Sequence, residues 1–221
     1  MFFLPFSLVI FLIFILLLPV IFVLFSTNVI GFAFSKLGIP PQIGMLFYLV
    51  SLASSVINIP IYKKHVDELF SFEIPGLHRF LFNIRPEFLN QQVLAVNVGG
   101  CILPLLLALF LFFRTPIRPV IICTLIMIIL CKILARPTPG IGIAIPAFIP
   151  PIVAAILAVL LAGRANAPAV AYISGVLGVL IGADLLNLGI IKKFGYGVMS
   201  IGGAGVFDGI FLVGIIAVLI A

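Results

Sequence analysis

Two carboxylates stand in apolar stretches near the end of the chain. Asp184 lies within Gly-Ala-Asp-Leu-Leu-Asn-Leu at 182–188, and Asp208 lies within the glycine-rich stretch 202–212. An acid inside a bilayer costs about 2.5 to 3.5 kcal/mol on insertion scales, so it usually serves a function. Two such acids close together would share a proton or bind a cation. The pair could therefore catalyse hydrolysis as an acid and a base, or it could carry a proton or a cation.

The elements that position these acids are expected to be membrane helices. Of the 221 residues, 64% are hydrophobic and only 8% are charged, which excludes an ordinary soluble domain. We predict an all-α, polytopic membrane protein that forms a single membrane domain over residues 1–221. The expected spans, seven in number, are 2–25, 41–62, 91–113, 119–135, 144–162, 169–191 and 198–220.

The charged residues of the chain are placed as expected for a protein whose partner is a lipid bilayer. Residues 63–90 alternate phenylalanines with charges, which predicts a loop lying on the membrane interface. Its histidines and acids match no zinc-binding spacing, so we expect no metal and no cofactor. The net charge of +6 comes from basic residues scattered at the ends of apolar runs, which argues against a nucleic-acid partner. Stretch 2–25 is too long for a signal-peptide core, and we expect it to be retained as a span.

Stretch 137–151 is too rich in proline and glycine to form a regular helix. It contains Pro137, Pro139, Pro146, Pro150 and Pro151, and proline breaks helices because its ring clashes with the preceding turn. Broken backbone at membrane depth is tolerated only where protein or a water-filled cavity satisfies it. The stretch is therefore expected either to line a cavity or to form a plain loop before a kinked span.

The distribution of basic residues predicts the orientation. With seven spans, eight lysines and arginines fall on the N-terminal side and four on the other, which places the N-terminus in the cytoplasm and the C-terminus outside a prokaryotic cell membrane. The spans that carry Asp184 and Asp208 should then be antiparallel neighbours with their acids nearly level. Small residues that permit close approach are present on both spans: Gly175, Gly178, Gly182, Gly202, Gly205 and Gly209.

An internal repeat would relate residues 41–113 to residues 169–220. At an offset of 129, Asn58 aligns with Asn187 and Ser55 with Asp184, while Asn97 stands near a glycine pair as Asp208 stands near Gly209. Asn187 follows Asp184 by three residues and so shares its helical face. No lysine or arginine is expected at that depth. With Asp184 and Asp208 as the catalytic residues, the predicted substrate- or ion-binding set is Asn187, Asn58, Asn97, Ser55, Gly182, Gly202, Gly203, Gly205 and Gly209.

Several phrases of the chain resemble known families. GADLLNL (182–188), GGAGVFDGIFL (202–212), PGIGIAIPAFIPP (139–151) and QQVLAVNVGG (91–100) resemble an uncharacterised prokaryotic membrane family, a domain of unknown function. The acids also resemble the GxGD-type intramembrane aspartyl proteases, the presenilin and signal-peptide-peptidase group. That resemblance implies Asp184 and Asp208 as catalytic residues on neighbouring, oppositely directed spans. Gly182-Ala183-Asp184 lacks the second glycine of the motif, and the Pro-Ala-Leu element of those enzymes is absent.

Three functions follow from these observations. The first is an intramembrane aspartyl protease-like hydrolase, whose partner would be a transmembrane peptide. The second is a proton- or cation-coupled transporter or channel that uses the same acids together with the Asn and Ser side chains. The third is a membrane assembly subunit in which the acids are protonated and hydrogen-bonded. The sequence does not decide whether the protein forms homo-oligomers.

Overall fold

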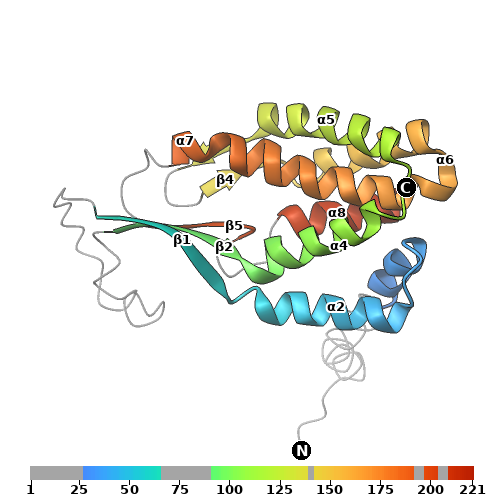
Figure 1. Ribbon diagram of the computed structural model, residues 1–221, viewed down its shortest axis with the longest axis horizontal. Helices are drawn as coiled ribbons and strands as arrows, with labels where there is room; N and C mark the ends of the chain where they lie inside the picture. Colours follow the sequence, from blue (N-terminus) through green and yellow to red (C-terminus); the bar gives the residue numbers. More distant parts are fainter. Residues whose placement is uncertain (1–26, 66–90, 139–141, 192–196, 204–208) are drawn as a thin grey trace, which may run out of the picture.

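The computed structural model describes residues 27–65, 91–138, 142–191, 197–203 and 209–221. Its helices pack together, and a small sheet projects from one end of them (Figure 1). The predicted first span, most of the predicted interfacial loop 63–90, and both Gly205 and Asp208 lie outside the described residues. The geometry of the Asp184–Asp208 pair therefore stays a prediction.

The described helices and strands follow one another along the chain. After helix Thr27–Lys36 come α2 (Pro41–Ser54), β1 (Asn58–His65), β2 (Gln91–Asn97), the π-helical turn η2 (Val98–Ile102), α4 (Leu103–Phe112), α5 (Ile117–Leu134), β3 (Arg136–Thr138), β4 (Gly142–Ala144), α6 (Ile149–Leu177), the π-helical η3 (Gly178–Asp184), the 3₁₀ turn η4 (Leu185–Asn187), α7 (Leu188–Ile191), β5 (Gly197–Ile201) and α8 (Gly209–Ile220).

Helix α5 agrees with the predicted span 119–135. Its 18 residues give a length of about 27 Å, close to the roughly 30 Å thickness of a bilayer's hydrocarbon core. Pro116 precedes its first turn, and the helix ends at Leu134, directly before the extended Ala135 and the Arg136-Pro137 step. The helix ends there because a residue that precedes proline is biased away from helical backbone.

Helix α6 is bent back on itself to form a helical hairpin. The backbone at Gly163 has φ +69° and ψ +161°, which interrupts the helix, and such a positive φ is easily reached only by glycine. Ala154 on the first arm lies beside Gly175 on the second, so the two arms pack side by side. The reversal at Gly163 confirms the sequence prediction of a turn between residues 162 and 169.

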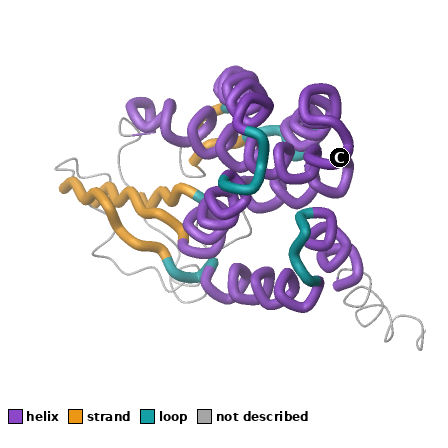
Figure 2. Tube along the Cα trace, turned by 45° about the vertical axis from the view of Figure 1, so that its right-hand side comes forward, coloured by secondary structure: helices purple, strands orange, loops and turns teal. Residues whose placement is uncertain are grey.

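Three strands form a mixed sheet in the order β1-β2-β5. Strand β2 is central: it pairs antiparallel with β1, where Asn58 faces Asn97, and parallel with β5, where Ala95 faces Ser200. Strand β1 shifts register between Pro60 and Tyr62, and an edge position with a bulge is where a strand tolerates proline. Figure 2 shows the sheet at one end of the molecule and the helices at the other.

The prediction of seven membrane helices is not supported. Among the described residues, Ile117–Leu134 and Ile149–Ile190 are long and apolar enough to cross a membrane, and a third crossing is added if Thr27–Lys36 and α2, bent by 115°, form one span. Predicted spans 41–62 and 91–113 each divide into a strand and a helix, and span 198–220 contains strand β5 and helix α8. An open sheet edge cannot face lipid, so the sheet belongs outside the hydrocarbon region.

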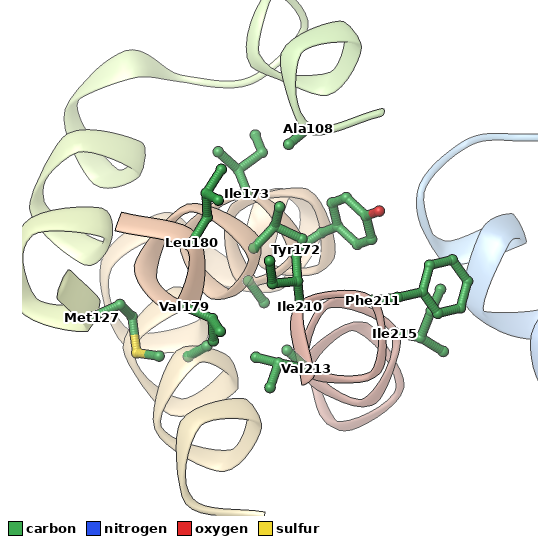
Figure 3. Packing of buried hydrophobic residues seen from close by; sticks show 14 of the residues in the cluster. Ala108, Met127, Tyr172, Ile173, Val179, Leu180, Ile210, Phe211, Val213 and Ile215 are labelled. Atoms are coloured by element: carbon green, nitrogen blue, oxygen red, sulfur yellow. The ribbon is translucent and has the colours of Figure 1, made fainter. Parts of the chain in front are cut away.

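The core lies between α5, both arms of α6, η3 and α8. Figure 3 shows Tyr172 and Ile173 of α6 and Val179 and Leu180 of η3 packed with residues of α8 and with Met127 of α5. Tyr172 is fully buried, and its hydroxyl donates to the carbonyl of Pro104, 3.5 Å away. Small residues let these helices approach closely, since a methyl group on Gly214 would meet the Tyr172 ring at 2.8 Å.

Candidate functional site

The helix that carries Asp184 changes its winding at the acid. It passes from the α-helical second arm of α6 into the π-helical η3, which ends at Asp184, then into the 3₁₀ turn η4, which ends at Asn187. Widened π-helical turns leave backbone groups out of the regular ladder and are frequent at functional sites. The break therefore falls at the residue that the sequence singles out.

A lysine from α5 is bound at this break. The Lys132 ammonium donates to Oδ1 of Asn187 at 2.6 Å and to the carbonyl of Leu186 at 3.0 Å. The Asn187 amide in turn donates to the carbonyl of Ala183 at 2.7 Å. The expectation that no lysine or arginine reaches the depth of the acids is therefore wrong for Asp184. It fails because a lysine side chain near a helix end can extend several ångströms along an apolar surface.

Asp184 is held against the same face of α5. Its Oδ2 atom is buried, and its charge lies within electrostatic reach of the Cys131 thiol. Gly182 makes this contact close, because a methyl group there would collide with the carbonyl oxygen of Ile128. The sequence prediction that Gly178 and Gly182 face the last span is corrected: both lie against α5, and Gly175 is the one beside Val213 of α8.

A membrane crossing by the second arm of α6 would place the Asp184 break near one membrane boundary. Asp184 follows Arg164 by 20 residues, and a helix of that length is about 30 Å long, as thick as the hydrocarbon core. Arg164 stands at the hairpin reversal, and Lys132 lies near the C-terminal end of α5. Asp184 and Lys132 therefore lie together near one face, and Arg164 lies near the other.

A second polar cluster forms where the sheet meets the helices. The amide of Asn97 donates to Oδ1 of Asn58 at 3.1 Å and to the carbonyl of Ser55 at 2.5 Å. Its Oδ1 accepts from the backbone N–H of Gly100 at 2.7 Å, and Ser200 donates to Oδ1 of Asn58 at 2.6 Å. Asn97 thereby connects β1, β2 and the start of the helix that leads into α4.

Glycines close this second cluster. A methyl group on Gly100 would collide with the Gly202 carbonyl oxygen, and one on Gly99 would collide with the Ser51 carbonyl oxygen. Gly202 and Gly203 have φ of +83° and +87°, a conformation that favours glycine. The Ser51 hydroxyl also donates to the Gly99 carbonyl at 2.5 Å. Parallel strands β2 and β5 are thus each followed within three residues by a glycine pair, Gly99-Gly100 in η2 and Gly202-Gly203 after β5.

The structure divides the predicted site residues between two places. Asp184, Asn187 and Gly182 come together on η3 and η4, whereas Ser55, Asn58, Asn97 and Gly202 come together beside the sheet. Gly209 begins α8, and Gly205 and Asp208 lie outside the described residues. Sequence reasoning missed Lys132 and Ser200. The position of Lys132, three residues before the end of an apolar run, is the signal for the first; nothing in the sequence singles out Ser200.

The proline-rich stretch lines a pocket. Strand β4 and the residues that follow it, from Ile143 to Phe148, face Leu212, Val213 and Ile216 of α8 across a pocket of 390 Å³. This finding agrees with the first of the two readings of residues 137–151, a segment that lines a cavity. The described lining residues are apolar, so the pocket offers contact surface to an apolar group and no groups for chemistry.

Comparison with known proteins gives one match. A family model with the description "Protein of unknown function (DUF1614)" matches residues 52–220. No curated protein and no solved structure matches the chain. The match covers both polar clusters and both elements that line the pocket, the β4 segment and α8, and its description assigns no activity to them.

Proposed function

Because the chain belongs to the DUF1614 family, whose description names no activity, we propose from its own geometry that it is a proton-coupled membrane transporter or channel in which Asp184 takes up and releases the proton. The observation that carries the proposal is the broken helix at Asp184, held by Lys132 of a second helix. Discontinuous membrane helices are where transporters build their ion sites. The orientation predicted from the basic residues would place Asp184 near the cytoplasmic face.

A proton fits this site better than a metal cation does. Asn187 Oδ1 and the Leu186 carbonyl, two oxygens within three residues of Asp184, already accept hydrogen bonds from Lys132. A metal ion would have to displace the ammonium group and would be repelled by it. Asp184 is also the only acidic side chain among the described residues. A single carboxylate suffices to bind a proton, whereas sodium or calcium needs several oxygen ligands.

Lys132 also joins the broken segment to α5, because its ammonium group donates to Leu186 and Asn187, which follow Asp184 within one turn. The positive charge of this second helix therefore stands close to the position at which the proton would bind. Protonation of Asp184 would change the charge in this region and, with it, how firmly α5 holds the broken segment. Proton uptake is in this way coupled to the packing of two helices, which is the coupling that a transport cycle requires.

Flux measurements test the proposal. Purified full-length protein in liposomes that contain a pH-sensitive dye should dissipate an imposed pH gradient, and Asp184→Asn should reduce the rate at least tenfold, whereas Arg164→Gln, at the opposite boundary, should leave it unchanged. Circular dichroism would show that each variant is folded. A wild-type protein without flux, or an Asp184→Asn variant as active as the wild type, would exclude the proposal.

Hydrolysis by an Asp184–Asp208 dyad remains a prediction of the sequence. It requires the two carboxylates within hydrogen-bonding reach of a shared water. In a background without Cys101, Cys123 and Cys131, the double variant Asp184→Cys, Asp208→Cys should form a disulfide on mild oxidation if the dyad exists, because disulfides need Cα atoms closer than about 7 Å. Transport without the dyad predicts that this bond does not form and that Asp208→Asn retains proton flux.

A further inference from the structure

A second pocket lies at the membrane face opposite Asp184. It has a volume of 360 Å³, within the range of about 300 to 1,000 Å³ typical of ligand sites. Its walls come from three elements: Phe34 before the bend of the helix pair, Ile43 and Phe47 on α2, and Leu107 and Phe110 on α4. The 115° angle between Thr27–Lys36 and α2 opens the space that α4 closes on the other side.

One cation lines this otherwise apolar pocket. Arg114, in the turn between α4 and α5, lines the pocket, and its guanidinium lies 4.1 Å from the centre of the Phe110 ring. A guanidinium stacked in this way keeps its N–H donors free to bind an oxyanion edge-on. Lys36, also near this end, is engaged differently, since its ammonium donates to the carbonyls of Val218 and Leu219 at the end of α8.

No acidic side chain among the described residues lies near Arg114. The only acidic side chain in the described part of the chain is Asp184, which lies at the far end of α5, near Cys131. Arg114 stands just before the start of α5, so it lies at the level where lipid headgroups meet the hydrocarbon core. An apolar pocket below an arginine at that level matches a molecule with an anionic head and an apolar chain.

We propose that this pocket binds a membrane phospholipid with an anionic headgroup. One acyl chain would lie against Phe34, Phe47 and Leu107, and the headgroup phosphate would accept charge-assisted hydrogen bonds from Arg114. Each buried methylene group favours binding, and the arginine makes the site selective among lipids. The site is independent of proton transport at Asp184, because the two lie at opposite ends of α5.

Native mass spectrometry of the delipidated full-length protein tests the site. Phosphatidylglycerol and phosphatidylcholine with identical acyl chains would be added in turn. The wild type should bind one phosphatidylglycerol about fivefold more tightly than phosphatidylcholine, the factor that one basic side chain contributes near a membrane surface. Arg114→Gln should remove this preference. Arg118→Gln, which changes an exposed arginine in the first turn of α5 that does not line the pocket, should retain it.

Two further variants separate the pocket from the charge. Ile43→Trp fills the pocket and leaves Arg114 in place, so it should weaken the binding of both lipids at least threefold. Arg114→Lys keeps the charge without the planar fork and should retain part of the preference. Excess inorganic phosphate should not displace the lipid, because it lacks the apolar chain. Equal losses in Arg114→Gln and Arg118→Gln, no effect of Ile43→Trp, or no preference in the wild type would each overturn the proposal.

Discussion

The Nζ atom of Lys132 lies 2.6 Å from Oδ1 of Asn187, although 55 positions separate the two residues. This bond joins α5 to the segment in which the helix after α6 changes from π-helical to 3₁₀ winding. Backbone groups left without partners in such a break are costly inside a membrane. The same ammonium group donates to the carbonyl of Leu186 at 3.0 Å, so Lys132 binds one side-chain oxygen and one backbone carbonyl of the broken segment.

Lys132→Gln should destabilise the protein measurably. The substitution removes a charged donor from Asn187 Oδ1 and from the exposed Leu186 carbonyl, and leaving the buried Asn187 side chain without its donor costs about 1 to 3 kcal/mol. The midpoint of thermal unfolding in detergent should fall by several degrees. Arg164→Gln, which alters an exposed arginine at the hairpin reversal, should leave the midpoint unchanged. Equal midpoints for Lys132→Gln and the wild type would show that the bond contributes nothing.

Asn97→Ala should lower the free energy of unfolding more than Ser54→Ala does. Asn97 is fully buried, and its side chain serves the Gly100 N–H, the Ser55 carbonyl and Asn58. Removing it leaves two buried backbone groups without partners, so we expect a loss of about 3 kcal/mol. Ser54→Ala, which removes bonds to the Val50 and Ser51 carbonyls within the same helix, is the control and should cost less than 1 kcal/mol. Chemical denaturation would measure both changes.

Two glycine-to-alanine substitutions should change stability in opposite directions, one through close packing and the other through helix propensity. A methyl group on Gly100 would collide with the Gly202 carbonyl oxygen, whereas a methyl group on Gly189 meets nothing within 4 Å. Gly100→Ala should therefore destabilise the protein by at least the 1 to 3 kcal/mol of an overpacked core. Gly189→Ala should stabilise it by up to about 1 kcal/mol, because alanine favours helix. Thermal shifts of the same sign in both variants would contradict the packed junction between β2 and β5.

The apolar runs of the sequence predicted helix α5 correctly, but they did not predict the strands. Helix α5 could be predicted because its 18 residues, apolar apart from Arg118, Thr124 and Lys132, form a run too long for a strand. Strands β2 and β5 could not, because a short apolar run is equally consistent with a strand and with half of a membrane helix. Strand β1 did carry a signal: Pro60 stands among Ile59, Ile61 and Tyr62, a β-branched and aromatic run in which proline argues against helix.

The sequence singled out several residues of the candidate site, but it did not predict which of them lie together. The cost of an intramembrane acid points to Asp184, and the three-residue spacing points to Asn187. An offset of 129 groups Asn58 with Asn187 as equivalent, yet in the structure Asn58 belongs to the sheet cluster and Asn187 binds Lys132. Pairing across 55 and 142 positions, as for Lys132 with Asn187 and Ser200 with Asn58, depends on the topology. Spacing along one chain does not encode it.

Gly182→Ala should loosen the Asp184 site without changing any polar group. An alanine methyl group would collide with the carbonyl oxygen of Ile128 and would lie 3.0 Å from Cβ of Cys131. Helix α5 and η3 would have to move apart, which lengthens the bond between Lys132 and Asn187 and exposes the backbone of residues 183–190. Hydrogen exchange in detergent should therefore be faster at those amides, by about tenfold if the local opening free energy falls by about 1.4 kcal/mol. Gly189→Ala is the control in the same segment. Unchanged exchange in Gly182→Ala would show that the broken helix is held without close contact to α5.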